Sequence, residues 1–304
     1  MPTILIAGGT GLVGLRLSQL LKEKKYDVLH LSRSKDPTAE FPAYQWDLGK
    51  GTIDQEAIEK ADYIINLAGA GIADKPWTKE RKQLIIDSRV DSTQLLKKYI
   101  AQQKTPPKAY IAASAVGYYG SRGDQLMKES DPPADKGFLA ESVTLWENAI
   151  RQVEETGVRL ATIRIGIVLS TQGGALEKIL LPFKFFNGAY FGSGQQWMSW
   201  VHIDDLCRMF IEAVENEQFQ GIYNGVGPHP SRNKDFVYKV KAALGKPALI
   251  VPAPEAALRL VMGEMADVVF ESTRVSSEKI EKTGFKFQFP ELVPALRDLL
   301  ERKV

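Results

Sequence analysis

The sequence has very few residues of the kinds that form covalent or metal cross-links. It holds a single cysteine, Cys207, among 304 residues, so an internal disulfide is impossible and a reducing, cytoplasmic location is expected. Its three histidines, His30, His202 and His229, are scattered, and none stands at ligand spacing from another histidine or from the cysteine. We therefore predict that the protein has no metal site.

Long apolar runs and a strong charge of one sign are missing as well. No stretch of about 18 apolar residues occurs, which argues against a membrane-spanning helix. The first apolar run follows "MP" without a basic segment and ends in glycines, so it predicts a strand rather than a leader. The formal net charge of +2 gives no reason to expect nucleic acid or a membrane as partner. We expect a small-molecule substrate, and either a monomer or a homodimer.

Short apolar runs alternate with helical patterns over the first 170 residues. Strands are expected at 3–8, 27–33, 43–48, 62–69, 108–115 and 159–170, and helices at 14–24, 54–61, 79–101 and 138–155. Such alternation favours a parallel sheet that is covered on both faces. The predicted fold class is α/β, with a Rossmann-type doubly wound sheet of six or seven parallel strands.

The pattern changes after residue 170. Glycines and aromatic residues dominate 188–206, and prolines gather at 228–230 and 252–254. We predict that residues 1–170 form the nucleotide-binding domain and that segments around 200–225 return to it. Residues 171–304 are predicted to form a smaller, interleaved mixed α/β cap.

The stretch "AGGTGLVG" directly follows the first strand and places three glycines three residues apart. The first glycine would allow the sharp turn, the second would let a pyrophosphate approach, and the third would let the helix pack closely on the sheet. The helix N-terminus adds free N–H groups and a positive partial charge. A plain strand-to-helix turn is the alternative. The residues predicted to bind the phosphates of a dinucleotide are Gly8, Thr10, Gly11, Leu12, Val13 and Gly14.

The end of the second strand bears on the choice of coenzyme. An acidic residue about 20 positions after the glycines would bind the ribose hydroxyl of NAD. The sequence has "LSRS" instead, with Ser32 and Arg33 and no acidic residue before Asp36. A guanidinium matches a phosphate with two parallel hydrogen bonds. We therefore predict NADP (NADPH) as the cofactor, with Ser32 and Arg33 at its 2′-phosphate; a solvated arginine is the alternative.

With these motifs in view, the chain resembles the extended short-chain dehydrogenase/reductase superfamily. More narrowly, it resembles the NADP-binding "epimerase family" proteins of the atypical branch, which are relatives of nucleotide-sugar epimerases. The resemblance covers nearly the whole chain. Its motifs are "GGTGLVG" (8–14), "LSR" (31–33), "WDL" (46–48), "NLAGAGI" (66–72), "SAVGYYG" (114–120), "FLAES…WE" (138–147), "IRIGIVL" (163–169), "WVHIDDL" (200–206) and "YNGVGP" (223–228).

The resemblance implies further cofactor contacts. Asp47, followed by Leu48, would bind the adenine amino group after the third strand. The backbone of Asn66, Leu67, Ala68 and Gly69 would line the central ribose and the diphosphate, and Ser114 and Ile167 would lie at the nicotinamide end. The segment from His202 to Asp205 would tie the cap to the cofactor domain, with Asp204 and Asp205 capping a helix.

One motif of the superfamily is missing. Its acid–base pair is Tyr-x-x-x-Lys on the helix after the fifth strand, where the lysine lowers the pKa of the tyrosine. Residues 138–155 contain neither tyrosine nor lysine. Alignment on Glu147 puts Leu139 and Val143 at the two positions. The motifs that bind the cofactor in this superfamily are therefore present, whereas its catalytic acid–base pair is absent.

Three residues could replace the missing pair. Ser114 is the best-placed hydroxyl, Tyr118 follows the fifth strand, and Glu141 lies on the helix of the lost motif. Each is a candidate proton donor, and packing, ion pairing or capping is the alternative for each. Arg164 could reach an anion or be buried in a structural pair.

The cap segment "FGSGQQWMSW" (191–200) combines side-chain amides with aromatic faces, which suits a sugar-like or ring-shaped substrate. The candidate substrate residues are Gln195, Gln196, Trp197 and Ser199, and an ordinary glycine loop with core tryptophans is the alternative. The expected function is that of an NADP(H)-binding, epimerase-like oxidoreductase acting on an unknown carbonyl or sugar-like compound. The alternative is a non-catalytic NADP-binding redox sensor or scaffold protein.

Overall fold

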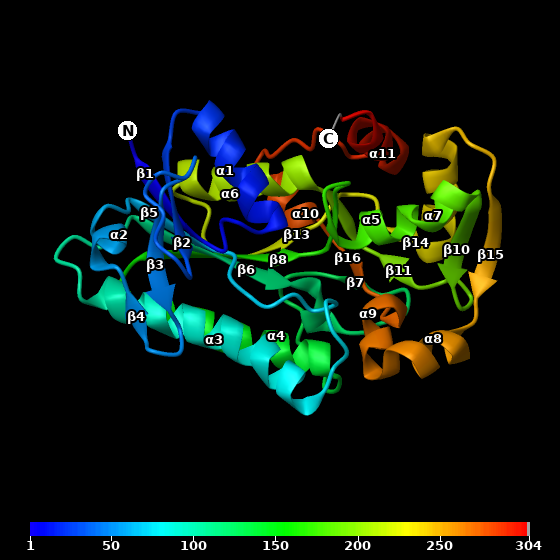
Figure 1. Ribbon diagram of the computed structural model, residues 1–304, viewed down its shortest axis with the longest axis horizontal. Coiled ribbons are helices and arrows are strands. Elements are labelled where there is room, and N and C mark those ends of the chain that lie inside the picture. Colours follow the sequence, from blue (N-terminus) through cyan, green and yellow to red (C-terminus); the bar gives the residue numbers. More distant parts are fainter. Residues whose placement is uncertain (303–304) are drawn as a thin grey trace.

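The computed structural model describes residues 1–302 and is built around an eight-stranded sheet with the order β13-β8-β6-β5-β1-β2-β3-β4 (Figure 1). The strands are β1 (Thr3–Ala7), β2 (Asp27–Ser32), β3 (Ala43–Asp47), β4 (Thr52–Ile53), β5 (Tyr63–Asn66), β6 (Ala109–Ala115), β8 (Arg159–Ile165) and β13 (Gly221–Gly225). All neighbours pair in parallel except β4, which runs antiparallel to β3. The predicted parallel α/β sheet is confirmed. Residues 303–304 of the predicted cap lie outside the described residues.

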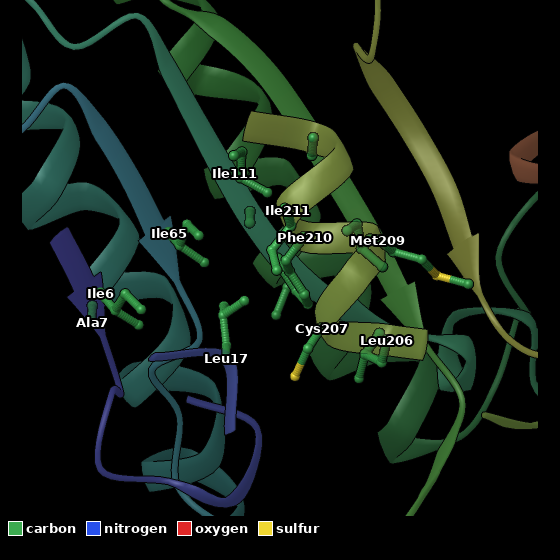
Figure 2. Close-up of a cluster of buried hydrophobic side chains, with 14 of the residues drawn as sticks. Ile6, Ala7, Leu17, Ile65, Ile111, Leu206, Cys207, Met209, Phe210 and Ile211 are labelled. Carbon is green, nitrogen blue, oxygen red and sulfur yellow. The ribbon is translucent and has the colours of Figure 1, made fainter. Parts of the chain in front are cut away.

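Helices cover both faces of this sheet (Figure 1). They are α1 (Leu12–Glu23) and α6 (Ile203–Glu215) on one face, and α3 (Lys79–Ala101) and α4 (Phe138–Arg151) on the other, with the short α2 (Gln55–Glu59) before β5. Between the first face and α1 and α6 lies an apolar core (Figure 2). Ile6, Ile65 and Ile111 come from three neighbouring strands, Leu17 comes from α1 and Phe210 from α6, and all five are buried. Both faces of the strands are therefore apolar, as in other buried parallel sheets.

The remaining elements are short and lie outside the eight-stranded sheet, and we refer to them together as the cap, although two of them, β7 and β9, precede residue 171. They are β7 (Leu126–Met127), β9 (Ile167–Leu169), α5 (Gly174–Leu180), β10 (Asn187–Phe191), β11 (Trp197–Met198), β12 (Trp200–His202), β14 (Ser231–Arg232), α7 (Asn233–Leu244), β15 (Leu249–Ala253), α8 (Glu255–Met262), α9 (Asp267–Phe270), β16 (Arg274–Val275), α10 (Glu278–Lys282) and α11 (Leu292–Glu301). Single 3₁₀ turns are η1 (Val116–Tyr119), η2 (Gln152–Thr156), η3 (Pro182–Phe185) and η4 (Gly263–Ala266). No helix within residues 1–302 is long and apolar enough to cross a bilayer.

The continuous strand expected over 159–170 is wrong in its extent. The chain breaks at Gly166, so that β8 stays in the main sheet while β9 leaves it and pairs with β12. A Cβ atom on Gly166 would lie 2.3 Å from the Ser199 carbonyl oxygen. Only glycine allows this close crossing, which begins the cap.

After this excursion the chain returns to the sheet, where α6 packs on α1 and β13 becomes the edge strand beside β8. Asp204 of α6 accepts hydrogen bonds from Arg16 of α1 at 2.7 Å and from Arg302, just after α11, at 2.7 Å. Burial alone would raise the pKa of Asp204, but these two guanidinium groups hold it below its ordinary value. The capping role expected for Asp204 and Asp205 is wrong, because the His202 ring accepts the Asp204 N–H and caps α6.

Candidate functional site

The glycine turn after β1 forms an open cradle at the carboxyl edge of the sheet. Gly8 has φ +80°, and a Cβ atom on it would lie 2.9 Å from the Leu67 carbonyl carbon. A Cβ atom on Gly14 would lie 2.3 Å from the Gly8 carbonyl oxygen, so α1 starts in contact with the turn. Beside Gly11, by contrast, only the Gly8 oxygen lies within 4 Å of such an atom among the described residues other than its neighbours in the chain. The space outside Gly11 is therefore free for a ligand to approach the backbone.

The first turn of α1 offers an anion several donors. The N–H groups of Leu12, Val13 and Gly14 have no acceptor within the helix, because the first turn of any helix lacks one. No acidic residue stands in this turn, and Thr10 and Gly11 before it are exposed. The positive end of the helix dipole adds to the attraction. The residues predicted to hold phosphates thus stand where their backbone suits an anion.

The end of β5 lies beside the cradle. The Asn66 amide group donates to the Tyr110 hydroxyl at 2.8 Å, while its oxygen accepts the Ala68 N–H at 3.1 Å. These two bonds fix the bend through which Leu67 passes Gly8. The side chain of Asn66 is buried and occupied, so this segment can reach a ligand through its backbone, as the resemblance implies.

Sequence reasoning missed a cation beside this segment. The Arg89 guanidinium, from the middle of α3, donates to the Ala70 carbonyl oxygen at 3.0 Å, and its central carbon would lie 3.0 Å from a Cβ atom on Gly69. Within residues 1–302 no carboxylate pairs with it. Burial, with a smaller effect of Arg81, lowers its pKa to about 10, so it stays charged at neutral pH. Nothing in the sequence distinguishes Arg89 from the other polar residues of its long helix, so its position beside Ala70 is known only from the fold.

The second and third strands end at the far side of the cradle. Arg33 follows β2 and is exposed, with Ser32 half-buried before it. Asp36, the nearest acidic residue, turns back and accepts the Thr38 N–H at 3.0 Å and the Thr38 hydroxyl at 2.8 Å. At the end of β3, Asp47 accepts the Lys50 N–H at 3.0 Å with one oxygen, and Leu48 is half-buried behind it.

At the end of β6, the hydroxyl of Ser114 lies in a buried polar network. It donates to Glu147 of α4 at 2.6 Å, and the same carboxylate accepts two hydrogen bonds from Arg164 of β8 at 2.7 Å each. Arg164 also donates to the Tyr119 hydroxyl at 2.8 Å, which in turn donates to Asn224 of β13 at 2.8 Å. Burial raises the pKa of Tyr119 to about 12, so it remains protonated. The structural pair considered for Arg164 is therefore present.

This network changes what can be expected of Ser114. Its hydroxyl already donates a hydrogen bond to the carboxylate of Glu147, which is paired with Arg164, and its side chain is buried. We expect Ser114→Ala to lower the free energy of unfolding by about 1.5–3 kcal/mol, the range for a hydrogen bond to a charged group, with NADPH affinity unchanged. Denaturant unfolding and NADPH titration measure the two effects. A turnover loss of about 10²-fold or more at unchanged stability would instead establish Ser114 as a proton donor.

The other two candidate donors differ in their surroundings. The guanidinium carbon of Arg164 lies 3.6 Å from the centroid of the Tyr118 ring. The hydroxyl of Tyr118 makes no hydrogen bond to another group within residues 1–302. Glu141 is exposed in the first turn of α4. Leu139 and Val143 lie near η1, since a Cβ atom on Gly117 would be 3.4 Å and 4.0 Å from them. The helix of the lost pair thus packs at the carboxyl end of β6 with an apolar surface.

Of the residues around the break at Gly166, Ile167 begins β9 and is half-buried, and its N–H donates to the Ser199 carbonyl at 2.8 Å. The Ser199 hydroxyl itself donates to the Thr273 carbonyl at 2.8 Å and accepts the Val275 N–H at 2.9 Å. The Gln196 amide donates to the carbonyls of Phe191 and Val269 at 3.3 and 3.2 Å. The structure therefore uses Ser199 and Gln196 to hold cap segments together and does not leave their donor groups free for a substrate.

Gln195 and Trp197 lie nearer to open space. Trp197 stands between Arg232 and Arg274, whose guanidinium carbons are 4.5 and 4.8 Å from its ring centroid. Gln195 is exposed and lines a cavity of about 400 Å³ in the cap. Its other lining residues are Gly123, Asp124, Phe191, Ser193, Gln196, Arg232, Glu255, Arg259, Phe270 and Ser272. Two ion pairs, Arg232 with Asp124 and Arg259 with Glu255, give this cavity charges of both signs. Within residues 1–302, no group of three or more histidine, cysteine or carboxylate side chains is placed to hold a metal ion.

Comparisons of the sequence with known proteins identify related families and relatives. A family model described as "NAD dependent epimerase/dehydratase family" matches residues 4–225, and "Domain of unknown function (DUF1731)" matches residues 253–299. An epimerase family protein of Staphylococcus aureus is 36% identical over 301 residues, which are 99% of this chain and 100% of that protein. An epimerase family protein of Staphylococcus saprophyticus is 36% identical over 300 residues.

Solved structures extend the likeness to three dimensions. The crystal structure of the human epimerase family protein SDR39U1 with NADPH superposes with a TM-score of 0.90 at 34% identity, covering 99% of this chain and 100% of that chain. The nucleoside-diphosphate sugar epimerase from Corynebacterium glutamicum gives a TM-score of 0.78 at 32% identity, covering 98% of this chain and 58% of that one. UDP-glucuronic acid 4-epimerase from Bacillus cereus, in complex with UDP-glucuronic acid and NAD, shares the fold with a TM-score of 0.79 at 18% identity. By sequence and by fold, this chain belongs to the NAD-dependent epimerase/dehydratase family.

Proposed function

We propose that this protein binds NADP(H) along the carboxyl edge of its sheet and acts as an oxidoreductase on a small carbonyl or sugar-like compound. The observation that carries the proposal is the cradle at Gly8, Gly11 and Gly14, which is open where a Cβ atom at Gly11 would point. A dinucleotide diphosphate fits there between the N-terminus of α1 and the backbone after β5. The Arg89 guanidinium, which has no carboxylate partner within residues 1–302, adds a positive charge on the same side.

NADP is favoured over NAD by the residues after β2. Arg33 is exposed and can meet a 2′-phosphate, whereas Asp36 lies three positions further on and has one carboxylate oxygen engaged by Thr38. The NADPH in the crystal structure of the human relative supports the same choice. Ser32 would add a hydroxyl at the phosphate, and Asp47 would accept from the adenine amino group. When bound, NADPH supplies the hydride.

The cap supports a polar substrate. Gln195 lies at a cavity that also holds two arginines and two carboxylates, a lining that suits hydroxyl and phosphate groups. The relative from Corynebacterium glutamicum is a nucleoside-diphosphate sugar epimerase by name, which supports a sugar-like compound. We place substrate binding between this cavity and the end of β6, in a protein that works as a monomer or homodimer.

A second candidate function is that of an NADP-binding redox sensor or scaffold without turnover. It is favoured by Leu139 and Val143, which occupy the positions of the superfamily's tyrosine and lysine and cannot transfer a proton. The engagement of Ser114 by Glu147 favours it as well. Both candidates require NADP(H) binding and differ only in chemistry.

One experiment separates the two candidates. NADPH and NADH affinities are first measured by fluorescence titration. NADPH absorbance is then followed with nucleotide sugars, sugar aldehydes and small ketones. Oxidation of NADPH that depends on one compound class supports the oxidoreductase, whereas tight binding without turnover on the panel supports the sensor. Failure to bind either coenzyme would contradict both.

Coenzyme selection gives a sharper prediction. Arg33→Ala should weaken NADPH binding by roughly 10- to 150-fold, because one charge-assisted phosphate contact is worth about 1.5–3 kcal/mol. NADH binding should stay almost unchanged, since NADH lacks the 2′-phosphate. Lys35→Ala is the matched control, as Lys35 is a nearby exposed cation that pairs with Asp54 at 2.7 Å. Equal losses for both coenzymes would show that Arg33 acts on the fold and not on the phosphate.

A further inference from the structure

Glu271 follows α9 and belongs to the cap, but its carboxylate faces the nucleotide-binding domain. Its neighbours Phe270 and Ser272 line the cap cavity, whereas one carboxylate oxygen of Glu271 is 3.7 Å from the position of a Cβ atom on Gly137. Gly137 is the residue before α4, two positions from Leu139. The side chain therefore reaches across the domain boundary to the start of the helix that has lost its tyrosine.

The chain around Glu271 is held against the segment that follows β6. The Ser272 N–H donates to the Ser121 hydroxyl at 2.9 Å, and the Arg122 N–H donates to the Ser272 carbonyl at 3.2 Å. The Thr273 hydroxyl donates to the Gly120 carbonyl at 3.0 Å. Glu271 thus lies between the continuation of β6 and the start of α4, next to a backbone segment held by hydrogen bonds to residues 120–122.

Strand order tells which part of a dinucleotide would lie at this place. The diphosphate cradle is at β1, and the residues for the adenosine half follow β2 and β3 on one side of it. An extended dinucleotide then runs the other way past β5 toward β6 with its nicotinamide half. The position of Glu271 is consequently at the nicotinamide end.

The carboxyl group of Glu271 is chemically unoccupied. Within residues 1–302 it makes no hydrogen bond and no ion pair, in contrast to Ser114 and Tyr119. Burial, together with the negative charge of Asp267 one turn earlier, raises its pKa to about 7. Asp267 is itself paired with Arg259 of α8, which also pairs with Glu255. Other charged side chains on the elements around Glu271 are paired or exposed: Lys82 with Glu264, Arg122 with backbone carbonyls, and Asp135, Lys136 and Glu141.

We propose that Glu271 exchanges a proton with the substrate oxygen in place of the missing tyrosine, an inference that rests on the oxidoreductase function proposed above. In reduction, the neutral carboxyl gives its proton to the carbonyl oxygen while the hydride of NADPH adds to the carbonyl carbon. The products are an alcohol, NADP⁺ and the Glu271 carboxylate, which takes up a proton from water. An acid that titrates near neutral pH suits this exchange in both directions.

The test uses coenzyme binding and needs no substrate. NADP⁺ carries a positive nicotinamide ring, whereas the ring of NADPH is neutral, so only NADP⁺ gains attraction when Glu271 ionises. The ratio of the NADPH to the NADP⁺ dissociation constant should rise about tenfold between about pH 6 and about pH 8, which corresponds to a pKa shift of one unit. Taking the ratio cancels every ionisation that both coenzymes share, including that of the 2′-phosphate. In Glu271→Gln the ratio should not change with pH.

Two further variants keep the test decisive. Glu264→Gln removes a carboxylate from the same cap segment that is paired with Lys82, and should retain the wild-type pH dependence. Asp267→Asn removes the charge that raises the Glu271 pKa and should move the midpoint to lower pH, which remains measurable even if Glu271→Gln does not fold. The proposal would be overturned if the ratio in the wild type did not change with pH, or if its pH dependence persisted in Glu271→Gln. Either result would leave NADP(H) binding intact. Failure of the wild type to bind either coenzyme would overturn both proposals together.

Discussion

Gly11→Val is expected to abolish NADPH binding while the protein stays folded. Within residues 1–302, and apart from its neighbours in the chain, a Cβ at Gly11 would meet only the Gly8 carbonyl oxygen at 3.3 Å, and φ −76° with ψ 170° suits a β-branched residue. The side chain would instead fill the space where the diphosphate meets the first turn of α1. Loss of two charge-assisted hydrogen bonds corresponds to at least about a 100-fold loss of affinity.

The measurement is a fluorescence titration of NADPH, with thermal unfolding as a check on the fold. Leu15→Val is the control, because it puts the same side chain on the exposed side of the same helix. Gly14→Val is a poorer test, since its Cβ would meet backbone at 2.3 Å and disturb the fold itself. Normal NADPH binding by Gly11→Val would mean that the cradle does not hold the diphosphate.

Arg164→Met is expected to destabilise the protein strongly, by about 3–5 kcal/mol. Arg164 and Glu147 side chains are 2% and 5% exposed, so removing the cation leaves a buried carboxylate without its charge partner. Tyr119 and the Tyr118 ring would lose contacts to the same guanidinium. Urea unfolding measures the change in free energy.

A double variant tests whether the loss comes from the stranded charge. Arg164→Met combined with Glu147→Leu removes both ions, and such replacements are often neutral or better. We expect the double variant to be more stable than Arg164→Met alone. Lys282→Met, which breaks an exposed pair with Glu278, should change stability by less than about 0.5 kcal/mol. A loss for Arg164→Met no larger than that of Lys282→Met would show that the buried pair contributes little to stability.

The parts of this fold that sequence patterns predict are those set by local rules. The glycine spacing after β1 and the alternation of apolar runs depend on neighbours within one or two turns of chain, and both are found in the structure. The break at Gly166 could not be foreseen, because its cause is the carbonyl of Ser199, a distant residue between β11 and β12. Similarly, patterns along the chain do not reveal that Arg89 reaches Ala70.

The candidate site shows the same limit more strongly. The absence of tyrosine and lysine from residues 138–155 is plain in the sequence, but what occupies their place is not. Glu271 follows Gly137 by more than 100 positions and is adjacent to it only because the cap folds back on α4. Ser114 stands at the expected strand end, yet its partner Glu147 comes from the following helix and accepts the hydrogen bond of its hydroxyl.

Arg16 and Arg302 both donate hydrogen bonds to Asp204, and this bears on the order in which parts of the fold can form during translation. Arg16 and Asp204 are 188 positions apart, and Arg302 follows 98 positions later. At ordinary elongation rates the interval between Arg16 and Arg302 lasts roughly 15 to 60 s. The helix that follows the glycine turn is therefore among the first elements translated, whereas the ion cluster that ties it to α6 and α11 is completed only when Arg302 has been made.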